Sequence, residues 1–498
     1  MFMDGLLMIV SVLLPIVSAL MLMRMPWLNE TRRTRCTFVG AVLVLECIVV
    51  ALVALEPQRT VVLFKMTEQL PIALRSDGTS RVFSIVMALM WANSGFFSFR
   101  YMSHEQNEQS YYAFYLLALG SLMGLTLSGT MVTMYLFFEL TTFLSVPMVL
   151  HTRTKEAIAA GIKYLIYSIA GATMGLLGIF FLTPNLGSPY FVEGGTLMAN
   201  ALNIPREALL AIIFVTLVGF GTKAGMFPMH GWLPTAHPVA PAPASAVLSG
   251  VITKAGVLCI FRMLFYVIGP DFIRGTWVQT ALLSCATITV FMGSMLALRE
   301  KTLKKRLAYS SVSQVSYVLC GLYLLDTMAF DGALLQIVVH ALTKDALFLC
   351  AGAIIFTTGI TQVDEMHGLG KHMPWTMWLF TICSISLIGI PPLGGFIAKW
   401  YIAEGALSSS VPVALFNWLV PTVLLISALL TAGYLLPPSI TAFFDLRTDG
   451  ECKIPQVRAK PTMLMVVPIL LLTVAIVVIG VNPSPMIDAF NRLAASLF

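Results

Sequence analysis

The sequence predicts an all-α polytopic membrane protein, and three observations lead to that fold class. Of the 498 residues, 58% are hydrophobic and only 11% are charged, with a mean hydropathy of +0.87. Soluble domains carry about 25% charged residues. Apolar runs of about 20 residues, the length that crosses a bilayer as a helix, recur along the chain. Two of these runs are interrupted by prolines close to a lysine, as in the broken helices of transporters.

The apolar runs predict about fourteen transmembrane helices. They lie near residues 4–23, 36–55, 82–100, 111–129, 130–150, 157–182, 208–228, 243–268, 277–298, 306–325, 331–357, 375–402, 412–444 and 462–481. The N-terminus shows no basic n-region and no small-residue cleavage site, so the first run is expected to be a retained span.

Two stretches outside these runs predict structure at the membrane surface. Residues 61–64 and 70–74 are short β-prone runs that end at an Asp77-Gly78 turn signal, which predicts a hairpin. The residues after Asn482 are compatible with an interfacial helix.

The basic residues predict the orientation, because cytoplasmic loops are enriched in lysine and arginine. The richest clusters fall in odd-numbered loops: Arg24, Arg32, Arg33 and Arg35; Arg299, Lys301, Lys304, Lys305 and Arg306; Arg447, Lys453, Arg458 and Lys460. Both termini are therefore expected outside, although the long second loop also holds basic residues. The formal charge of +6 is explained by these loops and needs no nucleic acid.

The rest of the chain is organised around residues 219–262. Lys223 lies near the end of an apolar run that breaks at Phe227-Pro228, and Lys254 lies in the next run. A lone ammonium at bilayer depth costs about 2.5–3.5 kcal/mol on insertion scales, so two such lysines indicate function. The twelfth run breaks in the same way at residues 389–392 and is followed by Lys399. Broken helices five spans apart predict two inverted repeats.

Other polar residues within the runs each leave alternatives open. Glu139 either lies at the lipid edge or pairs with Lys223 so that each lowers the other's burial cost. Lys254 either belongs to a relay or bonds to a backbone carbonyl. Lys163 either belongs to the relay or extends its ammonium to the membrane surface, and Glu46 suits a partner interface as well as a transport role.

The densest polar cluster in any run lies near residue 340. His340 and Lys344 are four residues apart and therefore share a helical face, and Asp345 is adjacent. A histidine and a lysine at this spacing favour a relay.

Metal, redox and nucleotide chemistry have no visible motif in this chain. The eight cysteines are scattered singly, with no C-x-x-C, and neither G-x-G-x-x-G nor a P-loop is present. His230 and His237 are separated by prolines and have no third ligand nearby. We therefore expect no cofactor and no metal in this chain.

Four segments together resemble the proton-translocating antiporter-like subunits of respiratory complex I, Mrp-type antiporters and membrane-bound hydrogenases. They read FPMHGWLPTAHPVAPAPASAVLSGVITKAG, LKKRLAYSSVSQ, HALTKDALFLCAG and GIPPLGGFIAKW. The resemblance covers roughly residues 70 to 445. It implies N-terminal helices with a hairpin over 1–110, inverted five-helix repeats over 111–268 and 277–444, and a last helix with a short tail over 445–498.

The resemblance also implies roles for individual residues. Glu139 matches the glutamate of span five, Lys223 the lysine of span seven, and Lys254 the central relay lysine. His340 and Lys344 match the pair of span eleven, and Lys399 the last lysine of the second half-channel; Lys163 and Asp345 are weaker candidates. Three departures are informative. Lys399 replaces the glutamate known in one complex I member, Asp345 stands where a small or apolar residue is usual, and no long lateral helix follows span fourteen.

The expected function is that of a non-redox, proton- or Na⁺-translocating subunit in the cell membrane. The expected complex is a membrane-bound hydrogenase or a complex I-like oxidoreductase, with the D-type subunit of an Mrp antiporter as the alternative. The expected partners are membrane lipid, homologous antiporter-like subunits and a peripheral redox arm. That arm would hold iron–sulfur clusters and, in a hydrogenase, nickel–iron. A stand-alone solute carrier is the remote alternative, because it would need a substrate cavity. A membrane enzyme would need a nucleophile or metal cluster.

Overall fold

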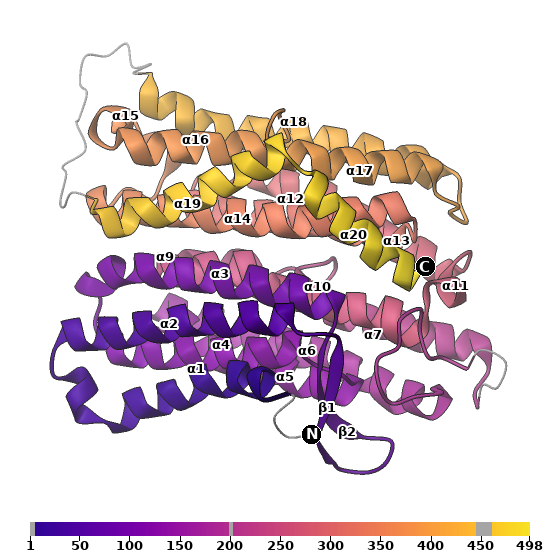
Figure 1. The fold of residues 1–498 in the computed structure, drawn as a ribbon. Helices are drawn as coiled ribbons and strands as arrows, with labels where there is room; N and C mark the ends of the chain where they lie inside the picture. The colour runs from indigo at the N-terminus through magenta and orange to yellow at the C-terminus, as the bar shows by residue number, and fades with distance from the viewer. Residues whose placement is uncertain (1–4, 199–202, 445–460) are drawn as a thin grey trace.

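The protein is a bundle of long, roughly parallel helices (Figure 1). The computed structural model describes residues 5–198, 203–444 and 461–498. Helices of the N-terminal half form one side of the bundle and helices of the C-terminal half form the other. The last two helices cross the front of the bundle in this view.

The helices of the N-terminal half match the predicted runs closely. They are α1 Leu6–Arg24, α2 Arg32–Leu55, α3 Gly78–Tyr101, α4 Glu108–Thr126, α5 Met131–Val149, α6 Lys155–Leu182, α7 Arg206–Ala224, α8 Leu233–Val239, α9 Ala242–Val247 and α10 Thr253–Arg262. Two π-helical segments, η5 Leu248–Ile252 and η6 Met263–Ile268, extend α10 at its two ends.

The C-terminal half is equally helical. Its elements are α11 Pro270–Ile273, α12 Trp277–Arg299, α13 Leu303–Tyr323, α14 Thr327–Thr358, α15 Leu369–His372, α16 Pro374–Ile388, α17 Gly394–Ser408, α18 Leu415–Phe443, α19 Met463–Val481 and α20 Ser484–Leu497. In the described residues, 11 helical segments are long and apolar enough to cross a membrane. The other three predicted runs coincide with α4, α13 and the pair α16–α17, and the count of about fourteen crossings stays a prediction.

The two predicted helix breaks are confirmed. Helix α7 ends at Gly225 in the left-handed region, with φ of 80°, and α8 starts only at Leu233. Helix α16 ends in the same way at Gly389, with φ of 93°, and α17 starts at Gly394. Glycine tolerates this conformation, and a proline shortly afterwards cannot continue the helix.

The predicted hairpin and the C-terminal helix are also present. Strands β1 Arg59–Lys65 and β2 Pro71–Ser76 pair antiparallel, and β2 is the more buried strand. Asp77 caps α3 by accepting a hydrogen bond from the backbone N–H of Ser80 at 2.9 Å. Helix α20 packs back onto the bundle, where the ring of Phe498 lies 5.3 Å from that of Phe265.

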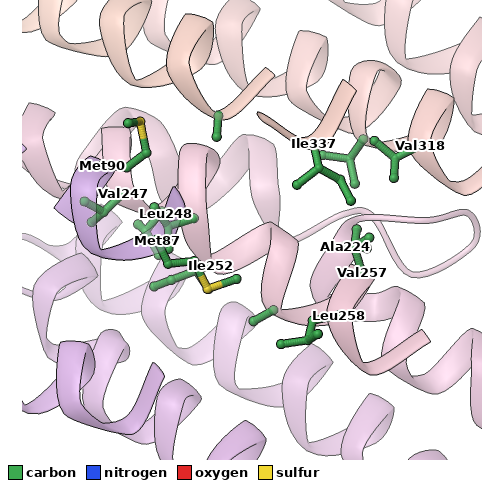
Figure 2. Close-up of a cluster of buried hydrophobic side chains, with 14 of the residues drawn as sticks. Met87, Met90, Ala224, Val247, Leu248, Ile252, Val257, Leu258, Val318 and Ile337 are labelled. Carbon is green, nitrogen blue, oxygen red and sulfur yellow. The ribbon is translucent and has the colours of Figure 1, made fainter. Parts of the chain in front are cut away.

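The most deeply enclosed segments are the composite helix Ala242–Ile268 and α14. Their apolar windows are 100% buried, whereas those of α1, α2 and α6 are 39% buried. Figure 2 shows apolar side chains around α10 that come from α3, α7, α13 and α14, among them Met87, Ala224, Val318 and Ile337. Polar groups on the two central helices are therefore surrounded by packed hydrocarbon.

Candidate functional site: a file of buried lysines

Lys254 lies at the start of α10, directly after a π-helical segment, and its side chain is only 1% exposed. π-Segments occur frequently at functional sites. The carbonyl of Ser249, within this segment, accepts a hydrogen bond of 2.8 Å from Lys254 Nζ. The same carbonyl accepts a second hydrogen bond, of 2.7 Å, from Thr253 Oγ1. One of the two predicted alternatives, a backbone carbonyl partner, is therefore present.

Lys254 also contacts the predicted polar cluster of α14. Its Nζ lies 2.6 Å from His340 Nδ1. Lysine ammonium is a donor only, so Nδ1 is the acceptor while Lys254 is charged. The other ring nitrogen, Nε2, is buried and has no hydrogen-bond partner in the described part of the protein. His340 can thus take a proton from Lys254 at one nitrogen and release one at the other.

Lys344 lies one turn further along α14 and is fully buried. Its Nζ donates to the carbonyl of Leu307 at 2.9 Å and to Ser310 Oγ at 2.7 Å, both on α13. The Tyr434 hydroxyl of α18 donates to the same Ser310 oxygen at 2.9 Å. The lysine is therefore held by neutral groups, and the hydroxyls of Ser310 and Tyr434 can exchange protons.

Lys399 occupies the break between α16 and α17. Its Nζ donates to the carbonyls of Leu387 at 2.5 Å and Ile388 at 3.0 Å, the last two residues of α16. The ring of Tyr317 lies 5.0 Å from the Nζ atom. The carbonyl end of a helix carries partial negative charge, so the break itself creates a place for a cation.

Lys223 lies in the last turn of α7 and is 1% exposed. Its Nζ donates to the carbonyl of Phe138 at 2.7 Å and lies 3.9 Å from the centre of that residue's ring. No contact within 4.0 Å joins the side chains of Lys223 and Glu139 in this conformation, so their predicted switchable pairing stays a prediction. Consecutive residues of a helix point about 100° apart, and half-buried Glu139 instead accepts a hydrogen bond of 3.2 Å from Tyr135.

Asp345 forms no ion pair with a lysine in the described part of the chain. Its Oδ1 accepts a hydrogen bond of 2.9 Å from Ser94 of α3, and its Oδ2 has no partner in the described residues. Gly250 borders this carboxyl, since a Cβ there would lie 3.4 Å from Asp345 Oδ1. Asp345 therefore faces α3 and the π-segment, whereas Lys344 faces α13.

We call Lys223, Lys254, His340, Lys344 and Lys399 the file. The remaining candidates lie apart from it. Lys163 is half-buried on α6, and its Nζ lies 6.0 Å from the ring of Tyr167. Glu46 is 1% exposed and accepts a hydrogen bond of 2.7 Å from Ser11 of α1. The chain's own helices therefore cover Glu46. Within the described residues, no group of three metal-ligating side chains includes His230 or His237.

Lys304 is a buried lysine that sequence reasoning missed. It was assigned to a charged loop, but it lies in the first turn of α13 at 5% exposure. Its Nζ donates to the carbonyl of Pro238 at 3.2 Å and to that of Ala240, at the end of α8. The neighbouring residue Lys305 forms an ordinary ion pair with Glu300 at 2.7 Å. Because Lys304 lies in the same basic cluster, the sequence alone offered no reason to separate it from these solvated charges.

A second missed feature is a buried ion pair at the end of α10. Arg262 donates to both carboxylate oxygens of Asp77, at 2.7 and 2.9 Å, and Arg75 donates to one of them at 2.9 Å. Burial alone would raise the pKa of Asp77, but the charge of Arg262 holds it well below its usual range. The pair fastens the hairpin and α3 to the helix that carries Lys254.

Replacing Asp77 by Asn is expected to destabilise the protein strongly. Breaking a buried ion pair costs about 3–5 kcal/mol, because the remaining charge is stranded. The measurement is the midpoint of thermal unfolding of the detergent-solubilised complex. Lys65→Met is the control, because it breaks an exposed pair with Glu68 and should leave the midpoint unchanged. Equal midpoints for Asp77→Asn and the control would show that the buried pair does not hold the hairpin in place.

These features define a class of protein: a polytopic helical bundle with a buried or half-buried lysine at each helix break. The family model described as NADH:quinone oxidoreductase/Mrp antiporter, TM matches residues 128–425. A relative from Desulforudis audaxviator, the N subunit of an NADH-quinone oxidoreductase, is 33% identical over 75% of this chain and 74% of its own length. The chain therefore belongs to this family and is an antiporter-like membrane subunit.

Two further relatives represent the other branches. The D-type subunit of the Na(+)/H(+) antiporter of Bacillus subtilis is 28% identical over 96% of this chain and 95% of its own length. Hydrogenase-4 component B of Escherichia coli is 28% identical over 84% of this chain and 64% of its own length. The recognition of the family from sequence motifs is confirmed.

The fold is shared with solved structures at lower identity. A chain of the Mrp complex from Dietzia sp. matches with a TM-score of 0.85 at 20% identity, covering 100% of this chain and 98% of that one. A chain of the membrane-bound sulfane sulfur reductase, an archaeal respiratory membrane complex, matches with a TM-score of 0.84 at 23% identity. The match covers 98% of this chain and 97% of that one. The predicted fold class is confirmed.

Proposed function

We propose that this chain translocates protons across the cell membrane along the file Lys223, Lys254, His340, Lys344 and Lys399. The observation that carries the proposal is the 2.6 Å contact between Lys254 and His340, which joins the two most enclosed helices of the bundle. Charged residues inside a membrane are costly and typically mark ion pathways. Structural lysines would be expected to pair with carboxylates, and none lies within 4.0 Å of these Nζ atoms in the described residues.

The physical basis of the proposed step is the cost of charge in hydrocarbon. A lysine that releases its proton removes a charge from the apolar interior, and a lysine that gains one restores it. Small movements of nearby charges therefore decide which lysine holds the proton. Within the file, the proton passes between Lys254 and His340 directly and reaches Lys344 and Lys399 through hydroxyl groups and water.

Glu139 is proposed as the residue that couples the file to a partner. In this conformation its carboxylate accepts a hydrogen bond from Tyr135 and does not contact Lys223. A movement that brings the two together would stabilise the charged lysine, and a return to the present arrangement would favour proton release. Lys163 and Asp345 remain weaker candidates, since neither contacts a lysine of the file.

The driving force is proposed to come from a multi-subunit membrane complex. A membrane-bound hydrogenase or a complex I-like oxidoreductase is the first candidate. Lys399, which stands where one complex I member has glutamate, favours the hydrogenase and Mrp D-type relatives. Its partners would be homologous antiporter-like subunits and a peripheral redox arm that holds the iron–sulfur clusters and nickel–iron. The second candidate is the D-type subunit of an Mrp antiporter, which the match to nearly the full length of the Bacillus subtilis protein favours.

The topology and repeats belong to the same proposal. Both termini are placed outside, with the basic odd-numbered loops in the cytoplasm. The spans from α4 to α10 and from α12 to α18 are proposed as inverted repeats. Both contain a helix that ends at a left-handed glycine, Gly225 or Gly389, close to buried Lys223 or half-buried Lys399.

The function is tested by purifying the complex through a tag on this chain and reconstituting it in liposomes. We expect the lumen pH to change when electron donor and acceptor are added, in the absence of Na⁺ as well as in its presence. Acid-driven Na⁺ exchange without any electron donor would assign the chain to the Mrp branch. If the reconstituted complex moves no ion under either condition, the proposed function is wrong.

A further inference from the structure

A small space lies between α13, α14, α16 and α17, beside the file. We call it the inner cavity, and its lining is Gln314, Gln336, Val339, His340, Ser386, Leu387, Gly395 and Lys399. Its empty volume is about 150 Å³, but no position in it is wide enough to hold the centre of a water molecule. His340 and Lys399 thus face one space that in this conformation does not let water connect them.

The polar atoms around the inner cavity are unusually poor in partners. Gln336 Nε2 donates to Gln314 Oε1 at 3.0 Å. Four other atoms find no partner in the described residues: Gln314 Nε2, Gln336 Oε1, His340 Nε2 and Ser386 Oγ. All four residues are at most 2% exposed. Buried polar atoms without partners cost free energy, so four of them around one space indicate that a polar occupant belongs there in another conformation.

We propose that Gln314 and Gln336, the amide pair, connect His340 to Lys399 by holding water in the inner cavity when it widens. The proposal rests on the proposed function and assigns one step of it, the transfer from α14 to the broken helix. Each amide offers two N–H donors and one oxygen acceptor. With His340 Nε2 and Ser386 Oγ, the pair supplies the partners that a buried water requires.

The broken helix controls the width of the inner cavity. At Gly395 of α17, a Cβ would lie 1.9 Å from the carbonyl oxygen of Ser386 on α16, so the two half-helices touch here at backbone distance. At Gly389 a Cβ would lie 3.0 Å from Lys399 Cδ. Any shift of α17 against α16 therefore moves Lys399 and changes the cavity together. The proton path from His340 opens only when this contact loosens.

The amide pair is tested by removing its polar groups at similar volume. Gln336→Leu and Gln314→Leu are each expected to lower the number of ions moved per turnover about tenfold. A positioned proton-transfer group contributes about 10²–10⁴-fold, and water restores part of that contribution when one amide is lost. The double variant should be no worse than either single one, because the two amides act as a unit. Gln336→Asn keeps an amide and should restore transfer. The measurement uses the assembled complex in liposomes, with the partner's turnover recorded in parallel.

A matched pair of serines separates this role from packing. Ser386 and Ser384 lie on the same helix, both fully buried and both with a hydroxyl that lacks a partner in the described residues. Only Ser386 lines the inner cavity. Ser386→Ala should lower ions per turnover, and Ser384→Ala should leave them unchanged.

Three outcomes would overturn the proposal. They are wild-type transfer by both leucine variants, equal losses in the two serine variants, and a Gln336→Asn variant as impaired as Gln336→Leu. Lys344→Ala in the same liposomes distinguishes this failure from that of the proposed function. If Lys344→Ala stops transfer and the leucine variants do not, the lysine file stands without the amide pair. If Lys344→Ala also transfers normally, the proposed function itself fails.

Discussion

Replacing Lys254 by Met is expected to stop ion translocation while leaving the partner's own turnover intact. Methionine fills a similar volume but cannot carry a proton, so the contact with His340 is lost. Removal of a positioned proton-transfer group costs about 10²–10⁴-fold in the rate of the step it serves. The measurement is the initial rate of lumen pH change in membrane vesicles, divided by the partner's turnover.

Lys301→Met is the matched control for this variant. Lys301 is exposed, and its backbone carbonyl accepts a hydrogen bond from the N–H of Val363, which the substitution leaves in place. The control should translocate as the unmodified chain does. A Lys254→Met complex that assembles and translocates at the control's rate would remove Lys254 from the pathway.

Replacing Glu139 by Ala or Lys223 by Ala is expected to stall translocation equally. Lys223 supplies the proton-binding group, and Glu139 supplies the charge that stabilises it in the alternate arrangement, so either loss blocks the cycle by about 10²-fold or more. Lys223→Arg should assemble but fail to release protons, because arginine stays charged. The measurement is the same ratio of lumen pH change to turnover. Exposed Lys155 at the start of α6 provides the control variant Lys155→Ala.

Thermal stability separates a coupling role of Glu139 from a structural one. Because no ion pair joins Glu139 and Lys223 in this conformation, Glu139→Ala should not change the thermal stability of the complex. A large loss of stability with normal translocation would mean that Glu139 has a structural role. Full translocation by both alanine variants would exclude the pair from the mechanism.

The sequence predicted the helical bundle and its breaks well, because these features depend on local chemistry. Hydropathy over about 20 residues predicts a spanning helix whatever its neighbours are. A glycine in the left-handed conformation followed by proline ends a helix by backbone sterics alone. The ends of α7 and α16 at Gly225 and Gly389 could therefore be anticipated without knowing which helices pack together.

The partners of the buried charges were less predictable, because they depend on helix rotation and packing. Phe138 and Glu139 are neighbours in sequence, yet Phe138, through its carbonyl and its ring, is the one that contacts Lys223. Asp345 is next to Lys344 but bonds to Ser94 on α3, a helix far away in the sequence. Side chains adjacent in a helix point about 100° apart, so proximity in sequence does not establish an ion pair.

Three buried polar residues, Lys304, Gln314 and Gln336, were missed for a related reason. Lys304 shares a basic cluster with exposed residues, and only the fold places it against the end of α8. Gln314 and Gln336 lie 22 residues apart on different helices, and their pairing required α13 to lie beside α14. The two glutamines carry no charge that would have drawn attention in an apolar run.

The most direct test of the central claim is the number of ions moved per turnover by the purified Lys344→Ala complex in liposomes. Lys344 is fully buried, and its Nζ bonds only to the neutral groups of Leu307 and Ser310 within the described residues. The account predicts that turnover continues and that ions moved per turnover fall to background. A ratio equal to that of the unmodified complex, at the same turnover, would contradict the claim that the lysine file carries the ion.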